Sequence, residues 1–228
     1  ISENKPTFII AEIGINHEGN YQKCLELINK AKLAGANGIK LQLVKPVDNY
    51  NRDSKSFKIY KKSEFSLSQI KKIYKYANKK KIILFSTMDD YHFKNIKINQ
   101  QIYKISSSQF NNLKLIKNIL KKNKPLLIST GMSSCNEILA LSKFLRQKTK
   151  VIFMHCISKY PLKNSECNLS MISFLKEKTK GIVGYSDHTK GTIACEIATM
   201  LGAKIIEKHF TYNTKRKGFD HKISLDYK

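Results

Sequence analysis

The sequence of 228 residues is short of cysteine, of acidic side chains and of long apolar runs. Its five cysteines are odd in number and unclustered, which argues against a disulfide framework or a four-cysteine zinc site and favours a reducing compartment. No stretch is apolar over the ~18 residues that a membrane span needs, and we expect no signal peptide, a cytoplasmic protein and no membrane partner. The chain begins at Ile1 without an initiator methionine, and we expect a fragment or a processed form.

Acidic side chains are outnumbered, since 17 aspartates and glutamates stand against 42 lysines and arginines, a formal net charge of +25. Such an excess can serve nucleic-acid binding, because contacts to phosphates need cations. The lysines, however, are spread over every expected helix and loop, and no helix-turn-helix, zinc-finger or single-strand-binding pattern accompanies them. We therefore expect no nucleic-acid partner, while a positive field of this kind favours anionic substrates.

Apolar strand patterns alternate with helical periodicity along the chain. Strands are predicted at residues 7–14, 38–44, 81–87, 102–106, 125–130, 151–156, 181–185 and 203–206. Helices are predicted at residues 21–35, 67–79, 113–122, 134–147, 168–178 and 192–203. Residues 48–66 are predicted to be a polar loop without clear structure, and the connection between the third and fourth strands is left open as a helix or something simpler.

Eight such strands favour a closed barrel over an open sheet, and we predict one α/β domain, a (β/α)8 TIM barrel, over residues 1–228. Nearly every strand ends in polar side chains, where barrels of this kind place their active sites. No strand is followed by G-x-G-x-x-G, so a dinucleotide-binding fold lacks its phosphate loop. After the eighth strand only a loop and SLDYK remain, so we expect no eighth helix and exposed apolar barrel surface in its place.

Polar groups gather at the ends of the seventh and eighth strands. The seventh predicted strand is closely followed by Asp187 and His188, and the eighth is closely followed by Glu207 and His209. Because a parallel sheet places the C-termini of its strands at one edge, we expect the two histidines to lie close together. With these carboxylates and Asp220 they could hold a divalent cation that keeps open positions, as catalytic sites do. The alternative is that each histidine only hydrogen-bonds at the end of its strand.

Two lysines, Lys40 and Lys104, lie inside apolar strands, where a lone ammonium is costly unless it meets an anion. Lys40 shares a strand face with Gln42, which argues against both lysines pointing outward between helices, although one of them could. Serines at other strand ends add hydroxyl donors; these are Ser107, Ser129 and Ser186. Together these groups describe a site for phosphate plus carboxylate, and a small dianionic metabolite fits it.

Several motifs occur in a fixed order over nearly the whole chain. They are AEIGINHEGN, GIKLQ, YKISS, PLLISTGM, HC-x-x-x-YP, GYSDHT-x-G, EKHFT and G-x-DH-x-x-SLD. In this combination the chain resembles the N-acetylneuraminate (sialic acid) synthase family, which includes synthases for legionaminic acid, pseudaminic acid and spore-coat polysaccharides. The resemblance implies a barrel that condenses phosphoenolpyruvate with an N-acetylated hexose, typically N-acetylmannosamine, to a nine-carbon 2-keto acid with release of phosphate.

The resemblance also implies roles for individual residues. His188 and His209 match the family's ligands of Mn²⁺ or Mg²⁺. The positions that match its phosphoenolpyruvate contacts are Lys40, Thr87, Lys104, Ser107, Ser129 and Ser186, and those that match its sugar contacts are Glu12, Gln42, Tyr160 and Asp220. We expect the two lysines to neutralise phosphate and carboxylate and Glu12 to move protons, although the sequence does not fix which group is the general base.

Three departures from the family pattern bear on activity. Gln109 stands where the family usually carries an acidic residue, and Ser158 stands where it usually has asparagine beside the phosphate. The resemblance also implies a C-terminal antifreeze-like domain, which in the family supplies an arginine to the partner's sugar site in a swapped homodimer, and we expect this chain to lack it. We therefore expect the chain to bind phosphoenolpyruvate yet turn over poorly, and a truncated barrel that only binds ligands is the non-enzymatic alternative. A metal-dependent barrel hydrolase is the rival enzyme, but the first strand offers only Glu12 in place of the usual His-x-His pair.

Overall fold

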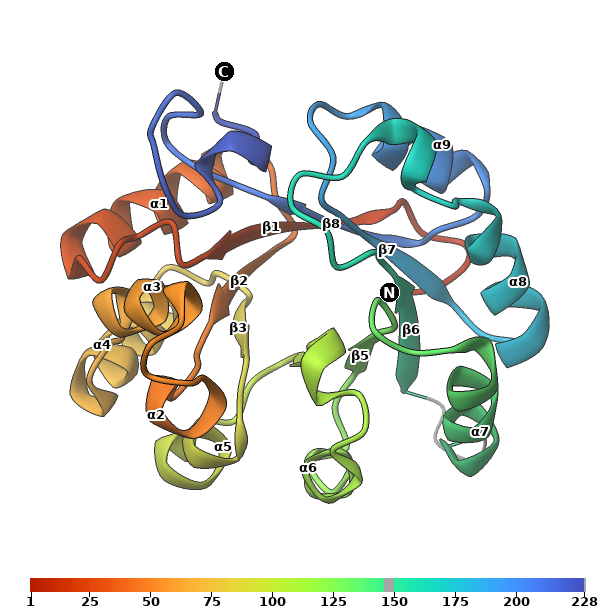
Figure 1. The fold of residues 1–228 in the computed structure, drawn as a ribbon, viewed down its shortest axis with the longest axis horizontal. Helices are drawn as coiled ribbons and strands as arrows, with labels where there is room; N and C mark the ends of the chain where they lie inside the picture. Colours follow the sequence, from red (N-terminus) through yellow and green to blue (C-terminus); the bar gives the residue numbers. More distant parts are fainter. Residues whose placement is uncertain (146–149, 228) are drawn as a thin grey trace. The chain divides into compact units, whose positions relative to one another are not determined.

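Parallel strands form the framework of the computed structural model, which describes residues 1–145 and 150–227 (Figure 1). In chain order the strands are β1 (Phe8–Gly14), β2 (Gly38–Gln42), β3 (Leu84–Thr87), β4 (Tyr103–Ile105), β5 (Leu126–Ser129), β6 (Val151–His155), β7 (Val183–Asp187) and β8 (Ile205–His209). They follow one another around a closed barrel in that order. Each strand overlaps one predicted segment, and the predicted (β/α)8 barrel is confirmed.

Helices separate the strands along the chain. They are α1 (Tyr21–Leu33), α2 (Pro46–Asn49), α3 (Lys55–Ser63), α4 (Leu67–Lys79), α5 (Asp90–Ile96), α6 (Leu113–Leu120), α7 (Cys135–Leu145), α8 (Ser170–Thr179) and α9 (Ile193–Met200). Short 3-10 turns add η1 (Ser107–Gln109), η2 (Asn164–Glu166) and η3 (His221–Ile223). All six predicted helices are present, with ends that differ by a few residues. The predicted end of the fourth of them, at residue 147, lies outside the described residues.

The prediction of a structureless loop at residues 48–66 is wrong, because this segment contains α2 and α3. The hydroxyl of Ser54 accepts a hydrogen bond from the backbone of Phe57 and starts α3. Only Ser63 of α3 is buried, so the segment lacks the buried apolar stripe from which a helix can be predicted. The connection left open between the third and fourth strands is also helical: Asp89 accepts from the backbone of His92 and starts α5.

After β8, the described residues up to 227 form loops and η3. Apolar side chains are exposed along α9, where Met200 is 86% accessible and Ile193 is 57% accessible. None of the helices described in residues 1–145 and 150–227 is both long and apolar enough to cross a membrane.

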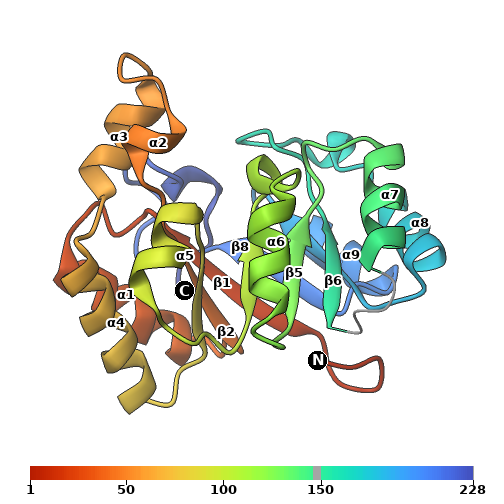
Figure 2. The ribbon, with the colours of Figure 1, turned by 90° about the horizontal axis from the view of Figure 1, so that it is seen from below.

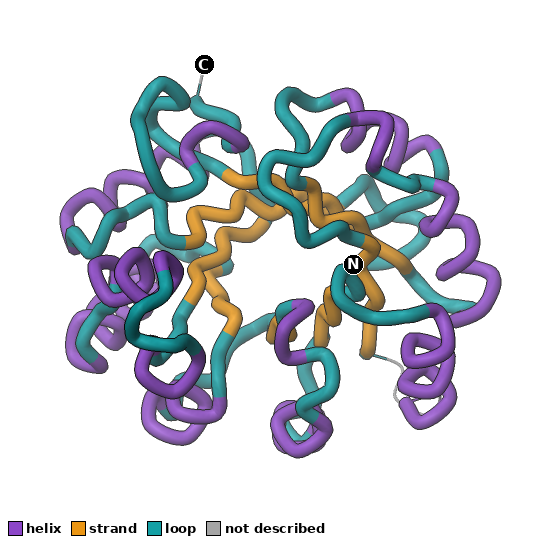
Figure 3. The backbone as a smooth tube through the Cα atoms, viewed as in Figure 1, coloured by secondary structure: helices purple, strands orange, loops and turns teal. Residues whose placement is uncertain are grey.

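The chain groups into two compact units. The first unit comprises residues 1–10 and 102–208, and the second comprises residues 11–101 and 209–228. In each unit the helices cover one face of the strands (Figure 3). The single domain predicted over residues 1–228 stays a prediction.

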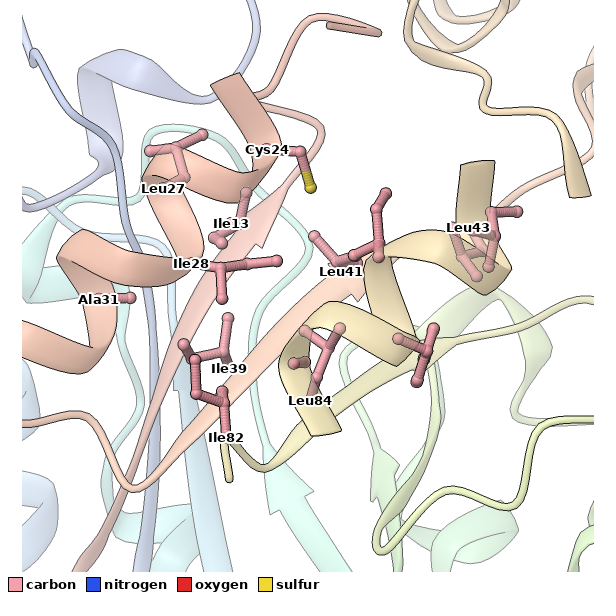
Figure 4. Packing of buried hydrophobic residues seen from close by; sticks show 14 of the residues in the cluster. Ile13, Cys24, Leu27, Ile28, Ala31, Ile39, Leu41, Leu43, Ile82 and Leu84 are labelled. Atoms are coloured by element: carbon pink, nitrogen blue, oxygen red, sulfur yellow. The ribbon is translucent and has the colours of Figure 1, made fainter. Parts of the chain in front are cut away.

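The core of the second unit forms where α1 lies against β1 and β2 (Figure 4). Asn20 accepts a hydrogen bond from the backbone of Lys23 and fixes where α1 begins. The helix then buries Cys24, Leu27, Ile28 and Ala31, which follow the spacing of one helical face, against apolar side chains of the strands. Full burial of each Leu or Ile contributes roughly 1.5–3 kcal/mol, and this packing holds the ends of β1 and β2 in place.

In the first unit, α8 packs on β6 and β7, and α9 packs on β7. Figure 2 shows α6 running alongside β5. Neighbouring strands are paired so that Ser129 of β5 lies beside Met154, and Ser186 of β7 lies beside Glu207 of β8. This register brings polar residues from the C-terminal ends of several strands to the same level.

Candidate active site

A buried lysine and a buried glutamate face each other in the first unit. β4 supplies Lys104 and β8 supplies Glu207, and the ammonium lies 3.1 Å from each carboxylate oxygen. The hydroxyl of Ser186, on β7, donates to the same carboxylate at 2.9 Å. All three residues are at most 5% exposed. Lys104 therefore does not reach outward to solvent, and Glu207 is an anion that it meets inside the unit.

Asp187 belongs to a separate buried network. Its carboxylate accepts hydrogen bonds from the hydroxyl of Tyr185, from the backbone and hydroxyl of Thr189, and from the ammonium of Lys208. Burial works to raise the pKa of Asp187, but the charge and hydrogen bonds of Lys208 outweigh it, and the pKa is lowered. These contacts engage the carboxylate that the sequence offered as a metal neighbour, and they fix the end of β7 on either side of His188.

His188 is buried and oriented by two contacts. Its Nδ1 lies 2.6 Å from the carbonyl oxygen of Ile157, and its ring lies 4.0 Å from that of Tyr160, centroid to centroid. Since a carbonyl oxygen can only accept, Nδ1 donates, and in the neutral ring Nε2 carries the lone pair. Burial lowers the pKa of His188 to about 4, so the ring is neutral at pH 7. A neutral imidazole whose Nδ1 is anchored to a carbonyl has the form that suits a metal ligand.

Four residues around the end of β5 form what we call the serine–cysteine cradle: Ser107, Gly131, Cys156 and Ser158. The backbone N–H of Gly131 donates to Ser107 Oγ at 3.0 Å, and Cys156 Sγ lies 3.2 Å from the same oxygen. A Cβ on Gly131 would lie 2.6 Å from Cys156 Sγ, 2.8 Å from Ser158 Oγ and 3.0 Å from Ser107 Oγ. Three polar side chains thus converge on one point that only glycine leaves open. Ser129 is buried at the end of β5, two residues before Gly131.

The second unit also buries a lysine beside a glutamate. Lys40 of β2 lies 2.9 Å from the carboxylate of Glu12 on β1, and both are at most 4% exposed. Gly14, the last residue of β1, has a φ of +54° and lies close to both carboxyl groups. A Cβ added to it would lie 3.0 Å from a Glu12 oxygen and 3.6 Å from an Asp220 oxygen. Burial raises the pKa of Asp220 to about 6, although the charge of Lys40 opposes the shift. Asp220 Oδ2 also lies 3.7 Å from His209 Nδ1.

The remaining predicted contacts fall on two neighbouring strands and a loop. Gln42 of β2 and Thr87 of β3 are partners in the strand register. Tyr160, in the loop after β6, is 53% exposed and covers the ring of His188. The first unit therefore brings together Lys104, Ser186 and Glu207, and it also holds Ser107, Ser129, Ser158, Tyr160 and His188. The second unit brings together Glu12, Lys40, His209 and Asp220 and holds Gln42 and Thr87.

A metal site shared by His188 and His209 stays a prediction. His188 belongs to the first unit and His209 to the second. Within residues 1–145 and 150–227, no three or more histidine, cysteine, aspartate or glutamate side chains form a group that could hold a metal ion. The form of His188 fits a ligand, but the carboxylates of Asp187 and Glu207, which the sequence placed around a cation, have amino-acid partners of their own.

Sequence reasoning missed the roles of Gly131 and Cys156. Gly131 lies in the motif STGM, two residues after the end of β5, and Cys156 lies in the motif HC-x-x-x-YP, directly after the end of β6. That position was the available signal. The contact between Ser107 and Cys156 joins residues 49 positions apart and depends on the register of β4, β5 and β6, so spacing alone could not reveal it.

Comparison with known proteins identifies the family. The model of the NeuB family matches residues 27–228. The chain belongs to the NeuB family. A relative in this group, an uncharacterized protein of Methanocaldococcus jannaschii, is 37% identical over 99% of the chain and 68% of its own length. The N,N'-diacetyllegionaminic acid synthase of Campylobacter jejuni is 34% identical over 97% of the chain and 72% of its own length.

A solved structure resembles the NeuB-family chain closely. The crystal structure of an N-acetylneuraminic acid synthetase from Leptospira borgpetersenii in complex with citrate has a TM-score of 0.90 and is 34% identical. The match covers 98% of this chain and 80% of the other. The barrel is therefore the fold of the family, and the strand ends described above are the part of the fold where such barrels carry their chemistry.

Proposed function

We propose that this NeuB-family chain condenses phosphoenolpyruvate with the open-chain aldehyde of an N-acetylated hexose and releases phosphate. The product is a nine-carbon 2-keto sugar acid. The observation that carries the proposal is the buried group of Lys104, Ser186 and Glu207, with the serine–cysteine cradle in the same compact unit. Support comes from relatives that are named as synthases of legionaminic acid, pseudaminic acid and N-acetylneuraminate 9-phosphate.

The first unit is the proposed binding region for phosphoenolpyruvate. An ammonium has three N–H donors, so Lys104 can keep Glu207 and also donate to an entering anion. The hydroxyls of Ser107, Ser129 and Ser158 are neutral donors, which hold phosphate and carboxylate oxygens without adding charge. Ser186 donates its single hydrogen to Glu207 and so supports the ion pair. Since these groups are largely held in place by strands, they need little reorganisation when the anion enters.

The second unit is the proposed region for the sugar and for proton transfer. In the reaction, C3 of phosphoenolpyruvate bonds to the aldehyde carbon, water adds at C2, and the bond from C2 to the phosphate oxygen breaks. One proton must therefore reach the aldehyde oxygen and another must leave the water. Asp220, with a pKa of about 6, can exchange a proton near neutral pH, and Glu12 beside it completes a pair of carboxyl groups.

Mn²⁺ or Mg²⁺ is the proposed cofactor, with His188 and His209 as its ligands. When bound, it would polarise the sugar aldehyde as a Lewis acid. For its part the chain supplies His188 as a neutral ring whose Nδ1 is anchored to Ile157, which aims Nε2. Homodimerisation and a cytoplasmic location likewise stay predictions.

The test is a phosphate-release assay with phosphoenolpyruvate, Mn²⁺ and a panel of sugars. The panel contains N-acetylmannosamine and 2,4-diacetamido-trideoxy hexoses. The second kind of sugar is included because one relative is named as an N,N'-diacetyllegionaminic acid synthase. We expect one sugar to release phosphate with a product mass equal to the sum of both substrates and water minus phosphoric acid. Release without sugar would indicate a phosphatase, and binding of phosphoenolpyruvate without release would leave only the binding function.

A further inference from the structure

We infer that Cys156 and Gly131 are positioning residues of the proposed phosphoenolpyruvate site, because together they fix the hydroxyl of Ser107 as a hydrogen-bond donor to the ligand. The inference rests on the proposed function, in which Ser107 contacts the anion. It adds two residues to the site and gives each a distinct task.

The argument begins with the oxygen of Ser107. A backbone N–H can only donate, so the 3.0 Å contact from Gly131 occupies one lone pair of that oxygen. Cys156 Sγ lies 3.2 Å from the same atom. If the thiol S–H donates as well, both lone pairs are occupied, and the single hydrogen of Ser107 is left for a third group. An anionic oxygen of phosphoenolpyruvate is such a group.

The direction of the contact between thiol and hydroxyl follows from the strengths of the partners. Thioether and thiol sulfur atoms are weak acceptors, whereas a phosphate or carboxylate oxygen is a strong one. With an anion present, the O–H of Ser107 therefore points to the anion and the S–H of Cys156 points to Ser107. The proton donors then run in one direction, from thiol to hydroxyl to ligand.

The accessibility of the cradle agrees with this order. Cys156 is 4% exposed, Ser107 is half-buried and Ser158 is exposed. A ligand that enters from solvent meets the two hydroxyls, and the thiol lies behind them. Cys156 consequently acts through Ser107 and does not touch the substrate, which makes it a positioning residue.

Gly131 contributes room as well as its N–H. Its φ is not in the left-handed region, so backbone conformation does not require glycine here. What requires it is the 2.6 Å to 3.0 Å distance from a Cβ to the three polar side chains. Any side chain at 131 would occupy the point on which the hydroxyls and the thiol converge.

A double-mutant cycle measured by calorimetric titration of phosphoenolpyruvate tests the inference in the chain of 228 residues. The variants are C156A, C156S, S107A and the double variant C156A/S107A, with C24A as a control that removes a buried thiol from the apolar cluster around α1. We expect C156A to weaken binding about three- to tenfold, the scale of one lost neutral hydrogen bond. C156S, which keeps a donor, should bind within about twofold of the parent chain.

The decisive comparison is the double variant. If Cys156 acts through Ser107, C156A has no further effect on affinity once S107A is present. An equal loss from C156A in both backgrounds, or a loss that C156S does not restore, would overturn the inference and mark the thiol as a packing residue. Thermal unfolding of each variant checks that the fold is kept. If S107A itself binds phosphoenolpyruvate as well as the parent chain does, the proposed function fails at this site, and the inference fails with it.

Discussion

The two compact units each bury a lysine beside a glutamate, yet the surroundings of the two pairs differ. In the first unit, the pair of Lys104 and Glu207 is joined by the hydroxyl of Ser186. In the second unit, the pair of Lys40 and Glu12 lies beside a further carboxyl group, that of Asp220. Hydroxyls around a cation suit the binding of anions, whereas a second carboxyl group next to a buried first one suits the exchange of a proton. In the proposed function, the two similar ion pairs therefore serve different steps.

Buried ion pairs are poor stabilisers, which is why their presence here is informative. Desolvation of the two charges commonly cancels their attraction, and apolar residues of similar volume would serve a core at least as well. Two such pairs inside barrel strands are therefore better explained by chemistry than by stability.

The largest effect is expected from removal of a lysine. K104M and K40M each leave a buried carboxylate without its cation, and we expect each to lower the free energy of unfolding by about 3–5 kcal/mol in urea titrations. K121M, which removes an exposed lysine, is the control and should change it by less than about 0.5 kcal/mol. Losses below about 1 kcal/mol in both buried variants would mean that these ion pairs are not closed to water.

Two buried groups, one in each unit, should contribute to the pH dependence of stability with opposite signs, measured after treatment with a chelator. Asp220 has its pKa raised from 3.8 to about 6, so the folded state holds the proton longer and stability falls as pH rises from about 4 to 6. His188 has its pKa lowered from 6.5 to about 4, so stability rises as pH increases from about 4 to 6.5. Each effect amounts to about 3 kcal/mol at most.

In the parent chain these two slopes oppose each other, so variants separate them. Relative to the parent chain, D220N should make stability rise more steeply with pH from 4 to 6, and H188Q should make it rise less steeply, because other groups, such as His17 with its pKa lowered to about 3, still favour stability at higher pH. Urea titrations at three pH values between 4 and 7 give both slopes. Parallel curves for the two variants would refute the assignment of opposite proton linkage.

A methyl group at position 131 should disturb the cradle without disturbing the second unit. We expect G131A to weaken the binding of phosphoenolpyruvate by roughly 1–3 kcal/mol, the cost of overfilling a packed site. G181A is the control, because the nearest atoms to its Cβ are 3.8 Å and 3.9 Å away. Calorimetric titration of both variants checks the prediction, and equal affinities would show that the cradle is wider than described.

The smallest effect contrasts two hydroxyls. Ser186 donates to Glu207, and S186A should cost about 1 kcal/mol of unfolding free energy. Thr87 Oγ1 is buried and has no hydrogen-bond partner within the described part of the chain, so T87V should be neutral or slightly stabilising. Urea titrations compare the two variants. A larger loss of unfolding free energy in T87V than in S186A would contradict this difference between the two hydroxyls.

The sequence predicted the elements that bury an apolar face and missed those that do not. Helix α1 was predicted because Cys24, Leu27, Ile28 and Ala31 repeat at helical spacing, and the strands were predicted from apolar runs. Helix α3 was missed because it buries almost nothing and its lysines carry no periodic signal. Local pattern therefore reveals structure to the extent that packing depends on that pattern.

The candidate site was predictable in its residues but not in their partners. Lysine inside an apolar strand predicts a buried cation, and both Lys40 and Lys104 are buried. That Lys104 meets Glu207, 103 positions away, depends on barrel register, which no local spacing encodes. The same reason hid the contact of Cys156 with Ser107. Contacts between residues far apart in the sequence could therefore not be predicted from local patterns.

Titration of phosphoenolpyruvate into the parent chain, K104M and K121M by calorimetry at one fixed salt concentration tests the central claim most directly. The claim is that the first unit binds phosphoenolpyruvate through a buried lysine. It predicts saturable binding with one site per chain, a loss of about 1.5–3 kcal/mol in K104M, and no change in K121M. Because both variants lose one positive charge, a general attraction of anions to this basic chain would weaken them equally. Equal affinities of K104M and K121M, or no binding to the parent chain, would contradict the account.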